Sequence, residues 1–315
     1  MNNKKQKRIL FVGMPDMALI CLSKLVSDGF NIVGVVPPHH SEATYGLMCD
    51  FANTLKIPVI NYQNKLDEID FLHKIRQLNA DLAIVCSYNK KFPIEFLKSV
   101  KNGFINCHPS LLPMYRGANP YSHVIINNEK ETGITLHFMD EEFDTGNIIV
   151  QKKIQIEKNE TMGTLFNRMN YLSAELYSAF LEQYEKNPQI ISYPQPNGEY
   201  PKAYSIESKN MKNFIDWNKD ATYIERFVRA LNPFICAMTN FRGVFIKVYS
   251  SYVQDKKTKY EPGTICHTKD TLGIATGKGI LHIKTLQFGS YMIADAKEFI
   301  EKFKPQIGEK MGING

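Results

Sequence analysis

Short apolar runs alternate with helical patterns along the first ninety residues, and this alternation limits the fold more than any other feature of the chain. Strands alternating with helices are typical of a parallel sheet with helices on its faces. The strand-like runs are RILFVGM (8–14), NIVGVVPP (31–38), IPVINY (57–62) and DLAIVCSY (81–88). The helical stretches run from about residue 16 to 28, from 45 to 56 and from 69 to 79.

The turn after the first strand, GMPDMA (13–18), lacks the G-x-G-x-x-G spacing that binds dinucleotides. We therefore expect a Rossmann-like, mostly parallel α/β sheet without a sign of NAD. In open sheets of this kind ligands bind beyond the carboxyl ends of the strands. That rule selects Tyr88, after DLAIVCSY, and His108, in FINCHP (104–109), as candidate site residues.

The rest of the chain predicts the remaining elements of the first domain and then a second domain of a different class. GITLHFM (133–139) and NIIVQKKIQI (147–156) read as strands, and residues 161–186 as an amphipathic helix. A stretch rich in Pro, Gly and Tyr follows at 193–205 and reads as an extended linker. Beyond it, short strands separated by turn residues predict a small OB-like β-barrel. The expected division is a first domain at 1–192, a linker at 193–208 and the barrel domain at 209–315.

Charge and cysteine content restrict the class of protein without choosing one. The net charge is +6 and the sequence pI is ≈ 8.8, which favours a nucleotide, a polyglutamylated cofactor or an RNA equally. The six cysteines are scattered without a C-x-x-C pair, so we expect reduced thiols in a cytoplasmic protein and no metal site. The apolar run at 9–14 is too short for a signal peptide, and no run approaches the ~20 residues of a membrane span.

Asn106 and His108 are two residues apart in an extended run, so both side chains project from one face. They offer an amide and an imidazole whose ordinary pKa is about 6.5. Cys107 points to the opposite face and is poorly placed as a nucleophile. A catalytic histidine normally needs an orienting group. The stretch FMDEEFDTG (138–146) offers four carboxylates, of which Asp144 stands in a tight turn; the others are Asp140, Glu141 and Glu142. An isolated N-x-H is usually structural and an Asp before Thr-Gly usually a turn residue, so these residues alone indicate only a candidate acyl-transfer site.

A resemblance narrows this reading. NCHPSLLPMYRGANP (106–120), followed by ETGITLHFMDEEFDTGNII (131–149), closely resembles the folate-dependent formyltransferase family. Its members act on methionyl-tRNA, on sugar nucleotides and, more distantly, on glycinamide ribonucleotide. Weaker similarity covers the whole chain. The resemblance implies that an amine attacks the formyl carbon of 10-formyltetrahydrofolate without a metal. It implies that Asn106 and His108 stabilise the oxyanion or handle its proton, and that Asp144 orients His108 and relays protons.

The same resemblance implies where the two substrates lie. The pterin is expected against the loop after AIVCSY (83–88) and the backbone near FMDEEFD (138–144). Core packing explains the four aromatic residues and the methionine in the cofactor set below equally well. A structural salt bridge explains Arg116 nearly as well as contact with the acceptor does. The residues expected to contact the cofactor are Tyr88, Phe92, Phe138, Met139, Asp140 and Phe143, and those expected to contact the acceptor are Arg116 and Tyr115.

The acceptor is predicted from one loop. By resemblance, methionyl-tRNA enzymes carry a long basic loop after the second strand that grips the acceptor stem. The corresponding segment here, VVPPHHSEATYGLMCDFA (35–52), is short and has no Lys or Arg. Phosphate neutralisation dominates RNA affinity, so we expect a nucleotide-linked 4-amino sugar as acceptor, as in the enzyme that formylates UDP-4-amino-arabinose. Such an acceptor implies a role in polysaccharide synthesis.

Other readings stay open beside that one. Methionyl-tRNA is the alternative acceptor, since the second domain also resembles that of the tRNA enzymes and QDKKTK (254–259) is basic. A glycinamide ribonucleotide enzyme ranks third, and a hydrolase of formyl-folate shares the same three residues. A non-catalytic nucleic-acid binder would leave those residues without a role. A homodimer is compatible with the resemblance, although no segment identifies its interface.

Overall fold

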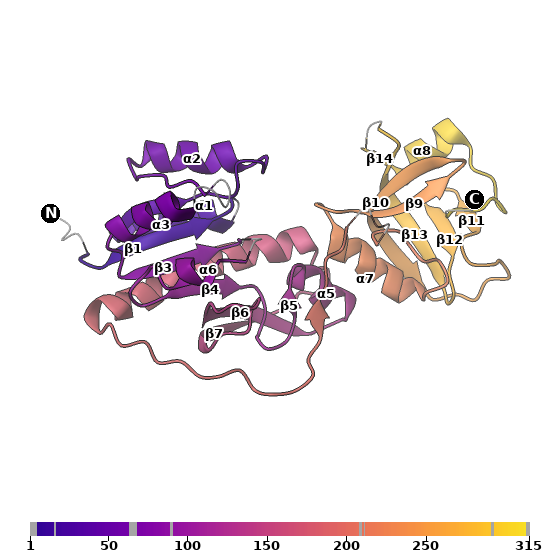
Figure 1. The fold of residues 1–315 in the computed structure, drawn as a ribbon. Helices are drawn as coiled ribbons and strands as arrows, with labels where there is room; N and C mark the ends of the chain where they lie inside the picture. The colour runs from indigo at the N-terminus through magenta and orange to yellow at the C-terminus, as the bar shows by residue number, and fades with distance from the viewer. Residues whose placement is uncertain are drawn as a thin grey trace. The chain divides into compact units, whose positions relative to one another are not determined.

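The structure, a computed structural model, falls into two compact units that are described separately here. The first unit comprises residues 1–120, 131–155 and 167–203, and the second comprises residues 121–130, 156–166 and 204–315. Within the chain the structure describes residues 5–15, 17–62, 68–88, 91–207, 210, 212–290 and 293–312 (Figure 1).

The first unit is built on a six-stranded sheet whose strand order is β2-β1-β3-β4-β6-β7. The first four of these strands run parallel, and β6 and β7 are antiparallel to their neighbours. The predicted α/β class with a mostly parallel sheet is confirmed. The strands are β1 (Arg8–Gly13), β2 (Asn31–Val36), β3 (Leu82–Cys86), β4 (Phe104–His108), β6 (Glu131–Phe138) and β7 (Ile148–Gln155).

Every residue of β3 is buried, as expected of a strand with helices packed on both faces of its sheet. On one face, Tyr177 of helix α6 (Met162–Lys186) contacts the sheet directly: its hydroxyl lies 2.7 Å from the carbonyl oxygen of Val85 and 3.1 Å from that of Ile105. The helices are α1 (Met17–Ser27), α2 (Tyr45–Thr54), α3 (Glu68–Gln77), α4 (Ile94–Leu97) and α6 (Met162–Lys186), the last of which belongs to this unit from Asn167 onward.

One predicted strand of this sheet is wrong. IPVINY (57–62) forms only an isolated parallel bridge between Val59 and Val35. The carbonyl oxygen of Pro58 accepts from the Val35 amide, but proline has no N–H with which to begin a ladder.

The second unit is built on an antiparallel sheet, as predicted for the C-terminal part. Its strand order is β11-β12-β13-β10-β9, with β14 paired to β13. The strands are β9 (Ala237–Phe241), β10 (Val244–Gln254), β11 (Ile265–Thr268), β12 (Leu272–Ala275), β13 (Ile280–Phe288) and β14 (Ile293–Asp295). Its helices are α5 (Pro120–Ile126), α7 (Ala221–Leu231) and α8 (Ala296–Phe303). The first residue of α5, Pro120, belongs to the first unit.

The predicted linker begins as part of the first unit. After α6 the chain runs extended along this unit and ends in β8 (Lys202–Ala203), which pairs in parallel with β5 (Arg116–Gly117) (Figure 1). The predicted junction with the second domain, Ser208 and Lys209, lies outside the described residues. In the part of the chain that the structure describes, no helix has the length and apolar character needed to cross a membrane.

Candidate active site

The strand register brings Asn106 together with a residue that the sequence analysis did not select. Asn106 of β4 lies opposite His137 of β6, and His108 lies opposite Thr135. Because alternate residues of a strand share a face, all four side chains point to the same side of the sheet. The expected pairing of Asn106 and His108 on one face is therefore present, and His137 joins them.

His108 is held at both ring nitrogens. Its Nε2 lies 2.8 Å from the carbonyl oxygen of Tyr115, and its Nδ1 lies 3.4 Å from Oδ1 of Asp144. A carbonyl can only accept, so the network assigns a proton to Nε2. The residue is only 4% exposed, and these two partners hold the plane of its ring. The predicted orienting carboxylate is in contact with the predicted histidine.

Asp144 occupies a turn whose geometry explains the Asp-Thr-Gly sequence. Its φ is +59°, in the left-handed region, and its Oδ2 accepts the backbone N–H of Gly117 at 3.0 Å. Gly146 is required two residues later, since a Cβ there would lie 1.9 Å from the carbonyl oxygen of Phe138. The turn therefore folds tightly back on β6 and points the carboxylate at His108.

His137 orients Asn106. Its Nδ1 lies 2.8 Å from the carbonyl oxygen of Phe138 and must donate to it, which leaves Nε2 to accept from the Asn106 amide at 3.2 Å. Burial, with the nearby His108, lowers the pKa of His137 to about 4. The ring is therefore neutral near pH 7, although Asp144 Oδ1 lies 3.7 Å from its Nε2. The sequence could have suggested His137 as a site residue, because it lies near the end of a predicted strand that leads into the acidic turn. Its partner could not be predicted, since the pairing with Asn106 depends on the register of β4 and β6.

A shallow hollow opens beside Asn106 and Asp144. It has a volume of ≈ 40 Å³, and a second hollow of ≈ 60 Å³ shares the side chains of Tyr88, Lys91 and Phe92 with it. Pockets for small molecules are typically ~300–1,000 Å³, so a bicyclic ring enters only if the shared side chains move apart. The first hollow is lined by Val85, Tyr88, Lys91, Phe92, Asn106, His137, Met139, Asp140, Glu141, Glu142, Phe143 and Asp144.

The structure gathers five of the six residues predicted for cofactor contact at this hollow. Tyr88 packs on Phe92 with ring centroids 4.8 Å apart, and burial, with Tyr62 and Glu42 nearby, raises the pKa of Tyr88 to about 12. The sixth residue, Phe138, does not line the hollow and packs its ring beside Gly103.

The acidic loop closes one side of the hollow. Asp140 holds the loop itself, since its Oδ1 accepts from the Glu142 amide at 3.1 Å and from the Thr145 hydroxyl at 2.6 Å. Phe143 is 49% exposed and lies under the Lys91 ammonium group, 5.5 Å from its ring centroid. Its ring is therefore available to a flat ligand.

The two residues predicted for acceptor contact lie next to His108. Tyr115 is buried, with φ at +60°, and its described contact in the site is its carbonyl oxygen on His108. Arg116 is half-buried and directs its Nε and Nη2 at Oε1 of Gln195. The guanidinium group is thus held in place by an amide rather than by a carboxylate.

Cys107 lies on the other face of β4. It is buried against α6, where its thiol donates to the Ser173 hydroxyl at 3.2 Å, and burial raises its pKa. A neutral buried thiol is a poor nucleophile. Among the described residues, no group of three or more His, Cys, Asp and Glu side chains has the arrangement of a metal site.

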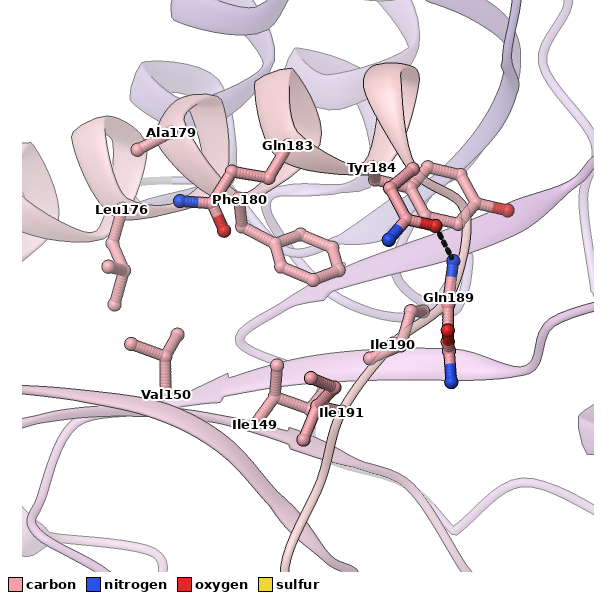
Figure 2. A pocket seen from close by; sticks show the side chains of 11 residues that line it. Ile149, Val150, Leu176, Ala179, Phe180, Gln183, Tyr184, Gln189, Ile190 and Ile191 are labelled. Carbon is pink, nitrogen blue, oxygen red and sulfur yellow. Dashed lines mark hydrogen bonds between the residues drawn. The ribbon is translucent and has the colours of Figure 1, made fainter.

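A larger hollow of ≈ 380 Å³ lies elsewhere in the first unit, between α6, β7 and the chain that follows α6 (Figure 2). Apolar side chains such as Val150, Phe180 and Ile191 form most of its wall. It contains none of the titratable residues of the Asn106–Asp144 hollow. Its polar lining consists of the amides Gln183, Asn187 and Gln189 and the hydroxyl of Tyr184, without a histidine or a carboxylate, so we take the smaller hollow as the candidate active site.

The cluster has the chemical groups that acyl transfer to an amine requires. The Asn106 amide is a hydrogen-bond donor that can stabilise negative charge developing on an acyl oxygen. The adjoining imidazole and carboxylate, His108 and Asp144, can accept and return a proton. Asn106 and His108 come from the end of β4 and Asp144 from the turn after β6, at the edge of the sheet that the sequence predicted.

Comparisons with known proteins agree with this chemistry. The profile of the Formyl transferase family matches residues 8–181, and that of the Formyl transferase C-terminal domain matches residues 207–304. The methionyl-tRNA formyltransferase of Clostridioides difficile is 34% identical over 313 residues, 97% of this chain and 100% of that protein. The enzyme of that name in Bacillus mycoides is 33% identical over 315 residues, 98% and 99% of the two chains.

A solved structure also shares the fold. The N-formyltransferase of Helicobacter canadensis, crystallised with folinic acid and dTDP-3-aminofucose, superposes with a TM-score of 0.63. It is 20% identical and the match covers 88% of this chain and 99% of that one. At this identity the likeness shows the fold alone.

The prediction of a nucleotide-linked amino sugar as acceptor is wrong. Relatives that match 89–98% of the chain at 31–34% identity are methionyl-tRNA formyltransferases, so they favour the alternative acceptor. The amino-arabinose type and a role in polysaccharide synthesis are not supported. The prediction depended on one short segment, 35–52, that lacks cations. Loops of this kind vary in length between relatives with little effect on the fold, and phosphate contacts can come from other parts of a chain.

The two family profiles together match most of the chain, and relatives more than 30% identical match nearly all of it. The chain therefore belongs to the formyl transferase family, and its predicted enzyme class, a folate-dependent N-formyltransferase, is confirmed.

Proposed function

We propose that this protein transfers the formyl group of 10-formyltetrahydrofolate to the amino group of methionyl-tRNA in the cytoplasm. The observation that carries the choice of acceptor is the match of 97–98% of the chain to enzymes of that name. The arrangement of Asn106, His108 and Asp144 supports the reaction itself.

Different residues of the chain stabilise the oxyanion and transfer the proton. The nitrogen–carbon bond to the methionyl amine forms, the bond to the folate nitrogen breaks, and one proton moves from the amine to that nitrogen. The Asn106 amide, oriented by neutral His137, donates to the formyl oxygen as it becomes negative. Asp144 and His108, whose Oδ1 and Nδ1 lie 3.4 Å apart, take up the proton from the amine and pass it on to the folate nitrogen.

The donor's ring would lie in the hollow between Tyr88 and the acidic loop. Phe92 and Phe143 supply apolar surface there, and the turn held by Asp140 supplies backbone polar groups. Donor binding would separate the side chains that now fill the gap. Residues of this loop would thus contact the donor while Asn106 and Asp144 face its formyl group.

The distribution of charge supports an RNA acceptor. Residues 204–315 contain 17 Lys and Arg against 11 Asp and Glu, which is a net charge of +6. Residues 1–203 contain 21 of each and are neutral overall. The whole positive excess of the protein therefore lies in its C-terminal third, which can neutralise phosphates that the segment 35–52 cannot.

The test is acceptor discrimination. The purified protein would be given 10-formyltetrahydrofolate in excess, with methionyl-tRNA or with dTDP- and UDP-linked 4-amino sugars, and release of tetrahydrofolate would be measured. We expect turnover on methionyl-tRNA and none above background on the sugars. Turnover on an amino sugar alone would overturn the proposal.

A further inference from the structure

We propose that Gln195 is a positioning residue for formyl transfer, fixing the turn that carries Asp144 against His108. The inference rests on the proposed reaction. The sequence places Gln195 in a segment that reads as a linker. In the structure, residues 193–203, here called the strap, instead belong to the first unit and run extended along it (Figure 1).

The amide of Gln195 is bonded on both of its sides. Its Nε2 donates to the carbonyl oxygens of Asp144, at 2.8 Å, and of Gly146, at 2.9 Å. Its Oε1 accepts from the Arg116 guanidinium, from Nε at 3.0 Å and from Nη2. One side chain therefore ties the Asp-Thr-Gly turn to the loop that follows β4.

The rest of the strap holds the same two loops. The amide of Tyr115 donates to the carbonyl oxygen of Pro201 at 2.6 Å, and β8 pairs with β5 at Gly117. Tyr115 supplies the carbonyl at His108 Nε2, and Gly117 supplies the N–H at Asp144 Oδ2. Both groups that orient the catalytic pair are thus bonded to the strap at the backbone.

The geometry at the turn requires an amide. Two carbonyl oxygens on one side need two N–H donors, and a guanidinium on the other side needs an acceptor. Glutamine meets both demands, whereas a glutamate has no donor and a methionine has neither. Without the amide, the backbone of the Asp144 turn loses its tie to Arg116, and the Gly117 N–H on the Asp144 carboxylate is left to join the two segments. A catalytic group displaced by about 1 Å can cost ~100-fold in rate.

Two variants and one control test the proposal. Gln195→Met keeps the length without polar atoms, and Gln195→Glu keeps the acceptor for Arg116 but removes both donors. Gln189→Met is the matched control, since Gln189 is an exposed glutamine just before the strap. We expect kcat to fall ~10- to 100-fold in both Gln195 variants. The KM for the formyl donor should stay within about twofold, and the control should match wild type.

A second readout does not depend on turnover. In ¹⁵N-histidine-labelled protein without substrates, the ring signals of His108, assigned with a His108→Asn variant, should shift in Gln195→Met and not in Gln189→Met. Unchanged signals together with wild-type kcat, and only a lower unfolding temperature, would reduce Gln195 to a structural role and overturn the proposal. Full kcat in Gln195→Glu would overturn it as well. If wild type forms no formylmethionyl-tRNA, the proposed acceptor fails while the histidine signals still decide this inference.

Discussion

The two partners of the His108 imidazole both have left-handed backbones. Tyr115, at Nε2, has φ +60°, and Asp144, at Nδ1, has φ +59°. The left-handed region costs an ordinary residue roughly 1–2 kcal/mol, less for Asp, and such conformations persist where the surroundings impose them. Here the carbonyl oxygen of Pro201 accepts from the Tyr115 amide, and the Gln195 side chain donates to the Asp144 carbonyl oxygen, so the strap holds both backbones. The folding energy of the first unit therefore maintains the geometry of His108 before substrate binds.

His137 makes stability depend on pH. In the unfolded chain its pKa takes the ordinary value of about 6.5, whereas burial lowers it to about 4 in the folded protein. Between these values the unfolded state binds more protons, so the free energy of unfolding falls as pH drops from about 6.5 to 4. The contribution is fully present above pH 6.5. Its loss is on the order of 3 kcal/mol, a net figure that already includes the opposing effect of Asp144 and Asp140 near the ring.

The measurement is the unfolding free energy of wild type and His137→Asn at several pH values, by urea titration. The variant should show a smaller slope between pH 6.5 and 4. His40→Asn, at an exposed histidine, is the control and should keep the wild-type slope. Equal slopes in all three proteins would contradict the assignment of a neutral, buried His137.

At the scale of elements, local pattern predicted most of the first sheet, and long-range contacts account for what was missed. The strands β1, β2, β3, β6 and β7 and the helix α6 follow from periodicity. Short elements such as α4 and α5 have too few residues to show a period. His137 and Gln195 could not be assigned, because their partners Asn106 and Asp144 lie 31 and 51 residues away and depend on register and on the path of the strap.

The Asp-Thr-Gly turn gives a prediction at this scale. Gly146→Ala would place a Cβ 1.9 Å from the Phe138 carbonyl oxygen, so the turn must move. We expect ~1–3 kcal/mol lower stability and formyl transfer reduced by ~100-fold. Gly46→Ala is the matched control, since nothing lies within 4 Å of a Cβ there and α2 should tolerate or gain from alanine. Normal activity in Gly146→Ala would show that the turn does not fix Asp144.

At the scale of the whole molecule, the sequence predicted both fold classes and the enzyme class, and it failed on the acceptor. The failure came from judging RNA binding by one loop, 35–52, while the positive excess lies in residues 204–315. A loop's charge is a local property, whereas phosphate neutralisation can be distributed over a chain. The domain division at 1–192, 193–208 and 209–315 stays a prediction. Because the strap is hydrogen-bonded to the first unit, we expect that separating the domains before residue 193 would disturb the site.

The most direct test of the account is formylation of methionyl-tRNA by wild type, Asp144→Asn and Asp50→Asn, the last an exposed aspartate on α2 that serves as control. Formylmethionyl-tRNA would be counted after acid precipitation, with 10-formyltetrahydrofolate in excess. The account predicts turnover by wild type and the control, and a kcat ~100- to 1,000-fold lower in Asp144→Asn. An Asp144→Asn kcat within about twofold of wild type would contradict the proposed site.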